Sequence, residues 1–301
     1  METFCTGGEQ IRANKKKADD MTNNDLTVFS CIKNGIRNGY PFVEAYASWS
    51  NYCDKIFVLD GYSDDGTDII LRKLSNLLPN FEFQFAPWPS FSSEGSSIAQ
   101  FTNLCLSKVK KNSNRLIYVQ ADEIFEKQTR EKLSTFVGGA VEFTQYILFW
   151  NSFYKIIRFE NTKHSSRSTL WKAIKLFPSV ADVTSIGDGL TFRVRDIPIN
   201  QWDDEVFHYG WNFPVNILQK HINHATLYPD NARYQYRARQ ASLLLKNGNY
   251  SIQDLEDLDP QYKDIARPFN GKHPDCIYHL IGKDFYDPYV GLTLLKNGVM
   301  W

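Results

Sequence analysis

The sequence predicts an α/β fold in which a mixed, mainly parallel sheet is flanked by helices and followed by a helical C-terminal part. In the first half of the chain, short runs rich in β-branched and aromatic residues alternate with amphipathic stretches, which is typical of βαβ units. After residue 136 the strand-like runs follow one another without helices between them. That change favours a mixed or antiparallel extension of the same sheet.

The first half of the chain contains the clearest strand and helix signals. The opening run LTVFSCI (26–32) is mostly apolar, as expected of a strand that is covered on both faces. Stretches with apolar residues at helical spacing then alternate with further strand-like runs. The helices are predicted at 42–49, 68–78 and 96–109, and the further strands at 55–60, 81–86 and 116–120.

The second half contains strand-like runs between polar loops, followed by two helical stretches. The strands are predicted at 141–150, 169–177 and 190–197, and the helices at 215–228 and 232–247. We find no internal repeat, low-complexity tract or linker, so we expect a single domain over residues 21–301. Residues 1–20 are polar and rich in Lys and Gly, and we expect them to form a disordered tail.

The composition argues against several kinds of partner. Lys plus Arg and Asp plus Glu both number 34, so the formal net charge is +0 and neither nucleic acid nor an anionic membrane surface is an expected partner. The five cysteines are widely spaced and include no C-x-x-C pair, so we expect free thiols, no structural zinc and a cytoplasmic location. No apolar run reaches the roughly 18 residues of a membrane helix, so no transmembrane segment is predicted.

An unusual carboxylate, Asp60, stands at the end of the predicted strand 55–60. The Ser/Asp/Gly residues at 63–66 after it can cap the next helix, which requires no ligand. That explanation does not extend to Asp60, which belongs to the strand rather than to the cap. Its carboxylate can accept hydrogen bonds from a nucleobase or a ribose.

A second acidic site, Asp122 and Glu123, follows the strand 116–120. Carboxyl ends of parallel strands meet at one edge of a sheet, so we expect this pair to lie near Asp60. Two carboxylates in one cleft repel each other unless a cation holds them, and oxygen ligands favour Mg²⁺ or Mn²⁺. A helix N-terminus with two acidic residues would give the same pattern without a metal.

Five segments of the chain are similar to a known family. They are VFSCIKN (28–34), IFVLDGYSDDGT (56–67), IAQFTN (98–103), LIYVQADE (116–123) and VFHYGW (206–211). In this order they resemble the family 2 glycosyltransferases of the Rossmann-like GT-A fold, and in particular a bacterial-type branch that carries QADE and a later HYGW. The likeness covers roughly residues 26–225, and FNGKHPD (269–275) resembles a further segment of that branch.

The resemblance implies a metal-dependent enzyme that transfers a sugar, with inversion, from a nucleotide-diphospho-sugar donor to a hydroxyl of a glycan or another acceptor. It implies bound Mn²⁺ or Mg²⁺ held through an Asp-x-Asp motif. By matching position, Asp60 would read the base, while Asp122 and a C-terminal His208 would bind the metal. Gln100 and Asn103 would belong to a helix that faces the donor.

The resemblance also divides the domain and shows one departure. It implies a nucleotide-binding half (21–136), an acceptor half (137–212) and a helical C-terminal part (213–301). Gln120 stands where the first Asp of the motif is expected, and an amide can bind ribose but holds a metal weakly. At the end of the first strand, groups near Lys33 and Asn34, including backbone N–H groups, are expected to help hold the pyrophosphate.

The general base for the acceptor hydroxyl is expected from the second half of the fold. Asp188 lies in a Gly-flanked turn before a strand, a position that can present a carboxylate to a cleft, although Asp-Gly is also an ordinary turn signal. Four other carboxylates are rivals for this role. They are Glu123, Asp203, Asp204 and Glu205.

Several residues near these motifs have ordinary structural explanations. Gly210 and Trp211 suggest a tight turn and an aromatic wall. The histidines at 221 and 224 have no acidic partner at a fitting spacing and are expected in solvent. The lysines at 172 and 175 are expected on the surface.

Two other functions stay open at the level of the sequence. A sugar nucleotidyltransferase would share the sheet, but its Gly-rich basic loop is poorly matched by SCIKNGIRNGYP (30–41). A non-catalytic nucleotide-sugar-binding protein would explain Gln120.

Overall fold

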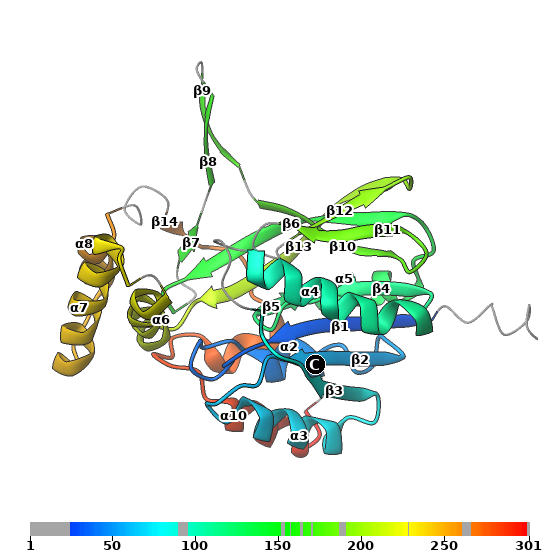
Figure 1. Cartoon of the computed structure of the whole chain (residues 1–301), viewed down its shortest axis with the longest axis horizontal. Coiled ribbons are helices and arrows are strands. Elements are labelled where there is room, and N and C mark those ends of the chain that lie inside the picture. Colours follow the sequence, from blue (N-terminus) through cyan, green and yellow to red (C-terminus); the bar gives the residue numbers. More distant parts are fainter. Residues whose placement is uncertain are drawn as a thin grey trace, which may run out of the picture.

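The structure of the chain is a computed structural model that describes residues 25–89, 96–151, 154–156, 158–162, 165–169, 171–186, 191–227, 229–260 and 266–299. Within these ranges ten strands form one sheet in the order β14-β7-β6-β10-β4-β1-β2-β3, and β13 and β5 pair off this path. Helices lie on both sides of the sheet (Figure 1). The predicted α/β class with a mixed sheet flanked by helices is therefore confirmed. The predicted N-terminal tail lies outside the described residues.

The N-terminal half of the sheet is parallel. Its strands are β1 (Leu26–Ile32), β2 (Lys55–Asp60), β3 (Phe81–Phe85) and β4 (Arg115–Tyr118). β1 pairs with β2 on one side and with β4 on the other, and the chain reaches β4 from β3 through α4 (Ser96–Val109). The strand order therefore reverses between β1 and β4, and such a switch point is where ligands bind in open α/β sheets.

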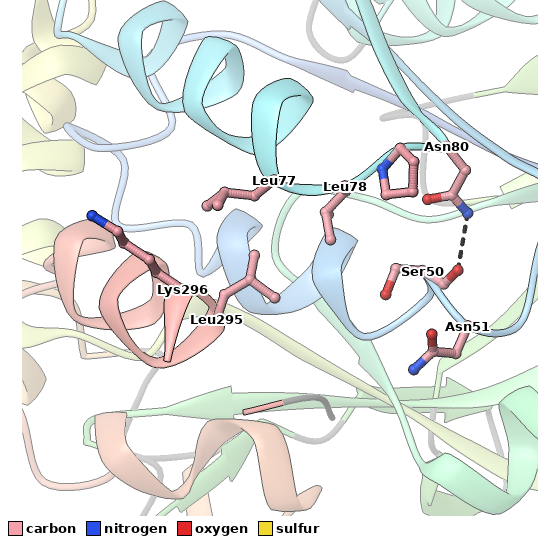
Figure 2. Close-up of a pocket in the computed structure, with 8 residues that line it drawn as sticks. Ser50, Asn51, Leu77, Leu78, Asn80, Leu295 and Lys296 are labelled. Carbon is pink, nitrogen blue, oxygen red and sulfur yellow. Dashed lines mark hydrogen bonds between the residues drawn. The ribbon is translucent and has the colours of Figure 1, made fainter. Parts of the chain in front are cut away.

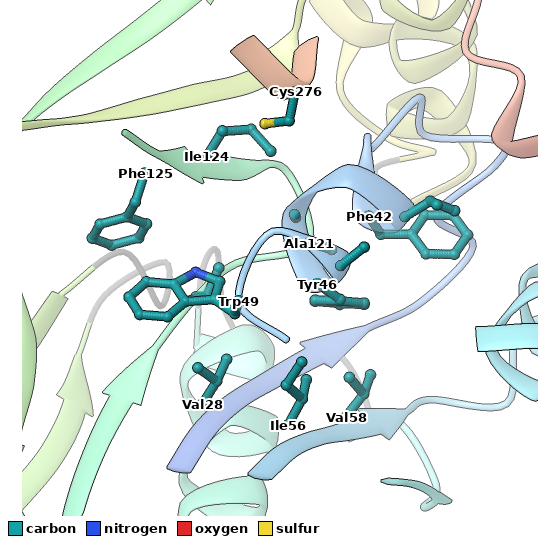
Figure 3. Packing of buried hydrophobic residues seen from close by; sticks show 14 of the residues in the cluster. Val28, Phe42, Tyr46, Trp49, Ile56, Val58, Ala121, Ile124, Phe125 and Cys276 are labelled. Carbon is teal, nitrogen blue, oxygen red and sulfur yellow. The ribbon is translucent and has the colours of Figure 1, made fainter. Parts of the chain in front are cut away.

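Alternation along the central strands supplies a core on each face of the sheet. Val28 packs on the face covered by α2 (Phe42–Ala47) and α3 (Thr67–Leu77), whereas its neighbour Phe29 packs on the opposite face with α4. Successive side chains of a strand point to opposite faces, so one strand contributes to both cores. Figure 3 shows the first core, where the strand residues Val28, Ile56 and Val58 lie near Phe42, Tyr46 and Trp49.

The second half extends the sheet from β4. Its strands are β5 (Glu123–Phe125), β6 (Ala140–Phe149), β7 (Tyr154–Ile156), β10 (Trp171–Pro178), β13 (Ile199–Trp211) and β14 (Ala266–Pro268). β10 runs antiparallel to β4 and β6, whereas β13 runs parallel to β6 and antiparallel to β5. The extension is therefore mixed, as the change of pattern after residue 136 predicts.

Two ribbons lie outside the main sheet. β8 (Arg158–Thr162) pairs with β9 (Ser165–Thr169) in a ribbon that extends away from the body (Figure 1). β11 (Asp182–Ile186) pairs with β12 (Thr191–Arg195) and packs near α4. The predicted strand 190–197 thus exists as β12 but joins β11 instead of the main sheet, because strand signals in a sequence do not name the partner strand.

Helices dominate the C-terminal part, as predicted. They are α6 (Pro214–Leu227), α7 (Ala232–Asn247), α8 (Ile252–Leu258) and α10 (Pro288–Lys296). α7 begins where the Asn231 side chain accepts bonds from two backbone N–H groups and ends at Gly248, whose φ is +66°. α5 (Lys127–Thr135) was not predicted, since this mostly polar helix buries only one apolar residue, Leu133.

Two expectations drawn from composition can be compared with the structure. Cys31, Cys53, Cys105 and Cys276 are free thiols, in agreement with the prediction for these four residues. Among the described residues, every helix is too short or too polar to span a bilayer.

A buried carboxylate joins the N-terminal half to the C-terminal part. Glu44 in α2 is fully buried, and its two oxygens contact His279 Nε2 and Tyr286 Oη, each at 2.9 Å. The Tyr286 hydroxyl also accepts a bond from the Val43 N–H at 3.2 Å. Burial raises the pKa of Glu44, and the bonds from His279 and Tyr286 oppose that effect. The hydroxyl of Tyr286 therefore serves two buried groups at once.

We expect Tyr286→Phe to lower the free energy of unfolding by about 1–3 kcal/mol, because it leaves a buried carboxylate oxygen and a buried N–H without a partner. Urea unfolding measures the change. Tyr289→Phe is the matched control, since Tyr289 is half exposed and should change stability by less than about 0.5 kcal/mol. Equal effects of the two substitutions would contradict the role given to the Tyr286 hydroxyl.

Candidate active site

A cavity of about 610 Å³ opens at the switch point between β1 and β4. The segments after both strands contribute to it, together with the start of α4 and one side of α6. Tyr40 and Trp88 form aromatic parts of its wall. The expectation that polar residues gather at the carboxyl ends of the strands is borne out for the segments after β1 and β4.

The charges in this cavity are mostly positive. Lys33, Arg37 and Lys220 line it, whereas Asp122 is the one Asp or Glu among the described lining residues. Arg37 is also paired with the exposed Asp64 at 2.8 Å. A lining with this balance suits a ligand with more than one negative charge.

The QADE and HYGW segments meet at Asp122, which lines the cavity. The backbone N–H of Tyr209 donates to the carbonyl oxygen of Asp122 at 2.7 Å, and β5 pairs with β13 so that Glu123 lies opposite His208. The FNGKHPD segment supports β13 from behind, where His273 Nδ1 lies 2.9 Å from the Tyr209 hydroxyl. Three segments that are far apart in the sequence therefore pack against one another beside the cavity.

The side chains of Asp122 and His208 are both buried and face each other. His208 Nε2 lies 3.4 Å from Asp122 Oδ1. The Gly210 N–H donates to His208 Nδ1 at 3.2 Å, so the proton of a neutral ring is assigned to Nε2, and Nε2 can bind a metal only when the proton moves to Nδ1 and this backbone bond is released. The tertiary structure thus brings together the two residues that were predicted as metal ligands.

The pair satisfies a simple test of geometry for a dication. Two neighbouring ligands of an octahedral Mg²⁺ lie about 3 Å apart, close to the separation of these two atoms. The Gln120 side-chain oxygen lines the same cavity and has no hydrogen-bond partner in the described part of the chain. No group of three His, Cys, Asp or Glu residues suited to a metal occurs within the described ranges. A metal here would be held by Asp122 and His208 and would take its other ligands from outside that set.

Gly210 provides the space that the Asp122 side chain occupies. A Cβ at this position would overlap Asp122 Oδ2 and would lie 2.5 Å from His208 Cε1. The predicted tight turn at Gly210 and Trp211 is wrong, because both residues belong to β13, which shifts register between His208 and Trp211. The glycine is needed for close packing and not for a turn.

We expect Gly210→Ala to lower the free energy of unfolding by about 1–3 kcal/mol, because the added methyl group overpacks the site. Urea unfolding of the purified variant measures the loss. In an Asp122→Ala background the same substitution should cost less, since one of the two overlapping groups is gone. A cost that is the same in both backgrounds would show that the methyl group does not press on Asp122.

Glu123 does not fit the base role expected for it. It is fully buried, and its Oε1 contacts Lys175 Nζ at 2.7 Å and Gln145 Nε2 at 2.5 Å, while its Oε2 accepts the Gln120 N–H at 2.9 Å. Lys175 was expected on the surface, yet it too is fully buried. This ion pair holds the turn that carries Asp122. The surface prediction for Lys175 is therefore wrong, and its place inside the apolar run LWKAIKLF was the available signal of burial.

Asp60 lies buried at the end of β2, beside Ile32 of β1. Its Oδ1 accepts bonds from the Ser63 N–H at 3.0 Å and the Ser63 hydroxyl at 2.7 Å. Asp60 therefore bonds to the first residue of the segment 63–66, which was predicted to cap the next helix. Its Oδ2 has no partner among the described residues. Burial raises the pKa of Asp60, and the bonds from Ser63 oppose that shift. Its predicted contact with a base stays a prediction.

The loop after β1 uses its backbone N–H groups internally. The N–H groups of Asn34, Ile36 and Arg37 donate to side chains at 63, 67 and 65. Asn34 and Lys33 line the cavity as expected, but the Asn34 N–H is engaged by Ser63 at 2.8 Å and is not available to a phosphate. The Lys33 side chain, whose Nζ donates to the Gly61 carbonyl at 2.8 Å, is the group there that can reach an anion.

The helix α4 meets the cavity with its first turn and not with the residues that the resemblance implies. Ser97 and Ile98 line the cavity. Asn103 instead bonds both backbone groups of Ser185, donating at 3.2 Å and accepting at 2.8 Å, and so joins α4 to β11. Gln100 lies exposed one turn earlier and is not part of the described lining. The expected donor-facing role of these two residues is not supported.

The remaining carboxylates that were predicted as general base are not found among the described lining residues of the cavity. Asp188 lies outside the described residues. Asp204 in β13 is occupied by Lys132 at 2.7 Å and Thr129 at 3.2 Å. None of Asp203, Asp204 and Glu205 belongs to the described lining of the cavity.

The two histidines of α6 differ from the expectation that both are solvated. His221 is buried, and burial lowers its pKa to about 3, with smaller contributions from neighbouring positive groups. His224 lines the cavity. Lys220, one helical turn before His224, is a buried residue that lines the cavity. Four lining residues were not predicted as part of the site from the sequence: Lys220, Arg37, Tyr40 and Trp88.

A second cavity, of about 550 Å³, lies between the end of α3, the segment after α2 and α10 (Figure 2). Asn80 donates to the Ser50 carbonyl at 2.9 Å at one side of it, and Leu295 and Lys296 line the other. Its lining combines leucines and amides with one exposed lysine. No Asp, Glu, His or Cys lines it in the described structure.

Comparisons with known proteins give structural neighbours alone. No family model and no curated protein matches the chain. S. aureus TarS 1–349 in complex with UDP is 13% identical, with 91% of this chain and 92% of that chain covered and a TM-score of 0.36. The mannosyltransferase PcManGT from Pyrobaculum calidifontis in complex with GDP-Man and Mn²⁺ is 12% identical, with 92% and 87% covered and a TM-score of 0.34.

A longer S. aureus TarS structure is 13% identical over 72% of this chain, with a TM-score of 0.39, and the match spans 43% of that longer protein. The chain therefore covers less than half of it. At these identities and TM-scores, the likeness says nothing of this chain's donor or acceptor.

Proposed function

We propose that the chain is a metal-dependent, inverting glycosyltransferase that uses a nucleotide-diphospho-sugar donor and a hydroxyl-bearing acceptor, such as a glycan. The observation that carries this proposal is the cavity at the switch point, which is lined by Asp122 and three cationic side chains, with His208 behind Asp122 at 3.4 Å. That combination suits a diphosphate and a dication together. The order of the VLD, QADE and HYGW segments along the chain agrees with the same function.

The chain's own residues divide the work in this proposal. Asp122 and His208 would hold Mn²⁺ or Mg²⁺, which would supply positive charge to the leaving diphosphate. Lys33 and Arg37 attract the donor phosphates from the loop after β1. Trp88 covers the Gly61 backbone beside Asp60 and offers an aromatic face to the base or the sugar.

The base that takes the proton of the acceptor hydroxyl is proposed to be Asp188, since its rivals Asp203, Asp204 and Glu205 are not in the described lining of the cavity and Asp204 is bonded to Lys132. In our proposal Glu123 is a positioning residue and not the general base. Its buried pair with Lys175 orients the turn that presents Asp122.

A thermal-shift screen tests the donor class. We expect UDP, GDP or one of their sugar derivatives to raise the melting temperature with Mn²⁺ or Mg²⁺, since a ligand of the folded state at about 100 times its Kd adds about 2.7 kcal/mol of stability. Release of nucleoside diphosphate with an acceptor present then separates enzyme from binding protein. Binding without release across an acceptor panel would favour a non-catalytic nucleotide-sugar-binding protein, the reading that Gln120 keeps open.

A sugar nucleotidyltransferase is the other alternative. It would release pyrophosphate from a nucleoside triphosphate and a sugar phosphate, which a coupled phosphate assay detects. We expect no such release, because the backbone N–H groups of Asn34, Ile36 and Arg37 in the loop after β1 are bonded to side chains.

A further inference from the structure

Lys220 is a buried cation in the wall of the cavity. It lies on α6, directly after the strand that carries His208, and 7% of its surface is exposed. Its Nζ donates to the Gly210 carbonyl and lies 4.6 Å from the centre of the Tyr40 ring and 5.1 Å from that of the Trp211 ring. Aromatic faces stabilise a cation at such distances without neutralising it.

The charge of Lys220 is not balanced by a close carboxylate. No Asp or Glu oxygen lies within 4 Å of its Nζ in the described ranges, although Asp122 is near enough to act on it electrostatically. Burial lowers the pKa of Lys220 to about 8, and Asp122 opposes that shift. Keeping an ammonium group in such a place costs stability. A charge that costs stability and faces a cavity is typical of a binding site.

The surroundings separate Lys220 from the other cations of the cavity. Arg37 is paired with Asp64, and Lys33 donates to the Gly61 carbonyl and lies near the Trp88 ring. Lys220 is the cation held by the same backbone, at Gly210, that makes room for Asp122. Lys220 is thus a cavity-lining cation on which Asp122 acts electrostatically.

We infer that Lys220 binds the donor's diphosphate next to the Asp122–His208 pair and shares with the metal the neutralisation of the leaving group. This inference rests on the proposed function and adds a protein cation to it. When the bond between the sugar and the diphosphate breaks, the diphosphate keeps the electron pair. An ammonium group beside the diphosphate stabilises that negative charge directly and not through a metal. It offers one reason why an amide at 120 can replace an acid in the motif.

The inference predicts that diphosphate binding survives, in weaker form, when the metal is removed. The test is calorimetric titration of the full chain with inorganic pyrophosphate, UDP, GDP, uridine and guanosine, with Mn²⁺ and with EDTA. Lys220→Met should lower the affinity for the diphosphates by about tenfold or more in both conditions and leave nucleoside binding unchanged. Lys220→Arg should keep most of the affinity, because it keeps the charge.

A matched control is available outside the cavity. Lys73 lies 4.6 Å from the centre of the Tyr289 ring, the same distance as Lys220 from Tyr40, but it is exposed on α3. Lys73→Met should change neither affinity. Without ligand, Lys220→Met should melt no lower than the wild type, because methionine removes a costly buried charge. If Lys220 were only a structural residue, the same substitution would lower the melting temperature.

The outcomes are distinguishable. Equal diphosphate affinity of Lys220→Met and the wild type overturns the inference and leaves the proposed function standing. A melting temperature that falls together with equal losses of diphosphate and nucleoside binding also overturns it, in favour of a structural role. Pyrophosphate binding that depends on Lys220, without binding of any nucleotide, supports the anion site and instead contradicts the proposed donor.

Discussion

Asp122→Ala is expected to lower the rate of donor turnover by about a thousandfold, because the charge that develops on the leaving diphosphate loses several kcal/mol of stabilisation when its metal site is removed. The measurement is nucleoside diphosphate released per minute with saturating Mn²⁺. The loss should be largest with metal and much smaller in EDTA, where the metal makes no contribution.

Asp182→Ala is the control for this prediction, since Asp182 is an exposed carboxylate on β11 that lies outside the cavity. It should leave turnover within about twofold of the wild type. The folded state of Asp122→Ala is checked by its melting temperature. Turnover in Asp122→Ala that equals the wild-type rate would eliminate the metal role of this residue.

The largest expected effect on stability belongs to the buried pair Glu123–Lys175. Removing one partner leaves an uncompensated charge in the interior, and we expect Lys175→Met to lower the free energy of unfolding by about 3–5 kcal/mol. The double variant Glu123→Gln, Lys175→Met should recover much of that loss, because both charges are then gone. Urea unfolding of the wild type, both single variants and the double variant measures the coupling.

Lys172→Met is the matched control, because Lys172 lies on the same strand and pairs with Glu142 at 3.9 Å with its side chain 53% exposed. An exposed pair of this kind contributes about 0–1 kcal/mol. If Lys175→Met cost no more than Lys172→Met, the pair with Glu123 would not be what holds the QADE turn.

The fold could be predicted largely from local patterns. The run 26–32 and its successors alternate with amphipathic stretches, and β1, β2, β3 and β4 appear where those runs were recognised. Helices with a wide apolar face, such as 68–78, were also visible, whereas α5 was missed because most of its residues are polar. Pairing was harder, as β12 illustrates, since strand residues do not encode which neighbour they bond.

The site could be predicted in part. The strand ends placed Asp60 and the QADE turn at one edge, because parallel strands bring their carboxyl ends together. Asp122 and His208 face each other across 3.4 Å, a contact that the resemblance, rather than any local pattern, anticipated. Asn103 was misjudged because the side of α4 that it occupies packs against β11.

By itself the sequence determined the class of fold, the positions of the main strands and the acidic residues at their ends, because hydrophobic period and turn chemistry are local properties of a chain. Tertiary structure alone decided which charges are buried together. Lys175 and Lys220 look alike in the sequence, yet one neutralises Glu123 in the core and the other faces the cavity without a close carboxylate among the described residues. That difference depends on which strands and helices pack side by side, and the energy of a charge is set by those neighbours.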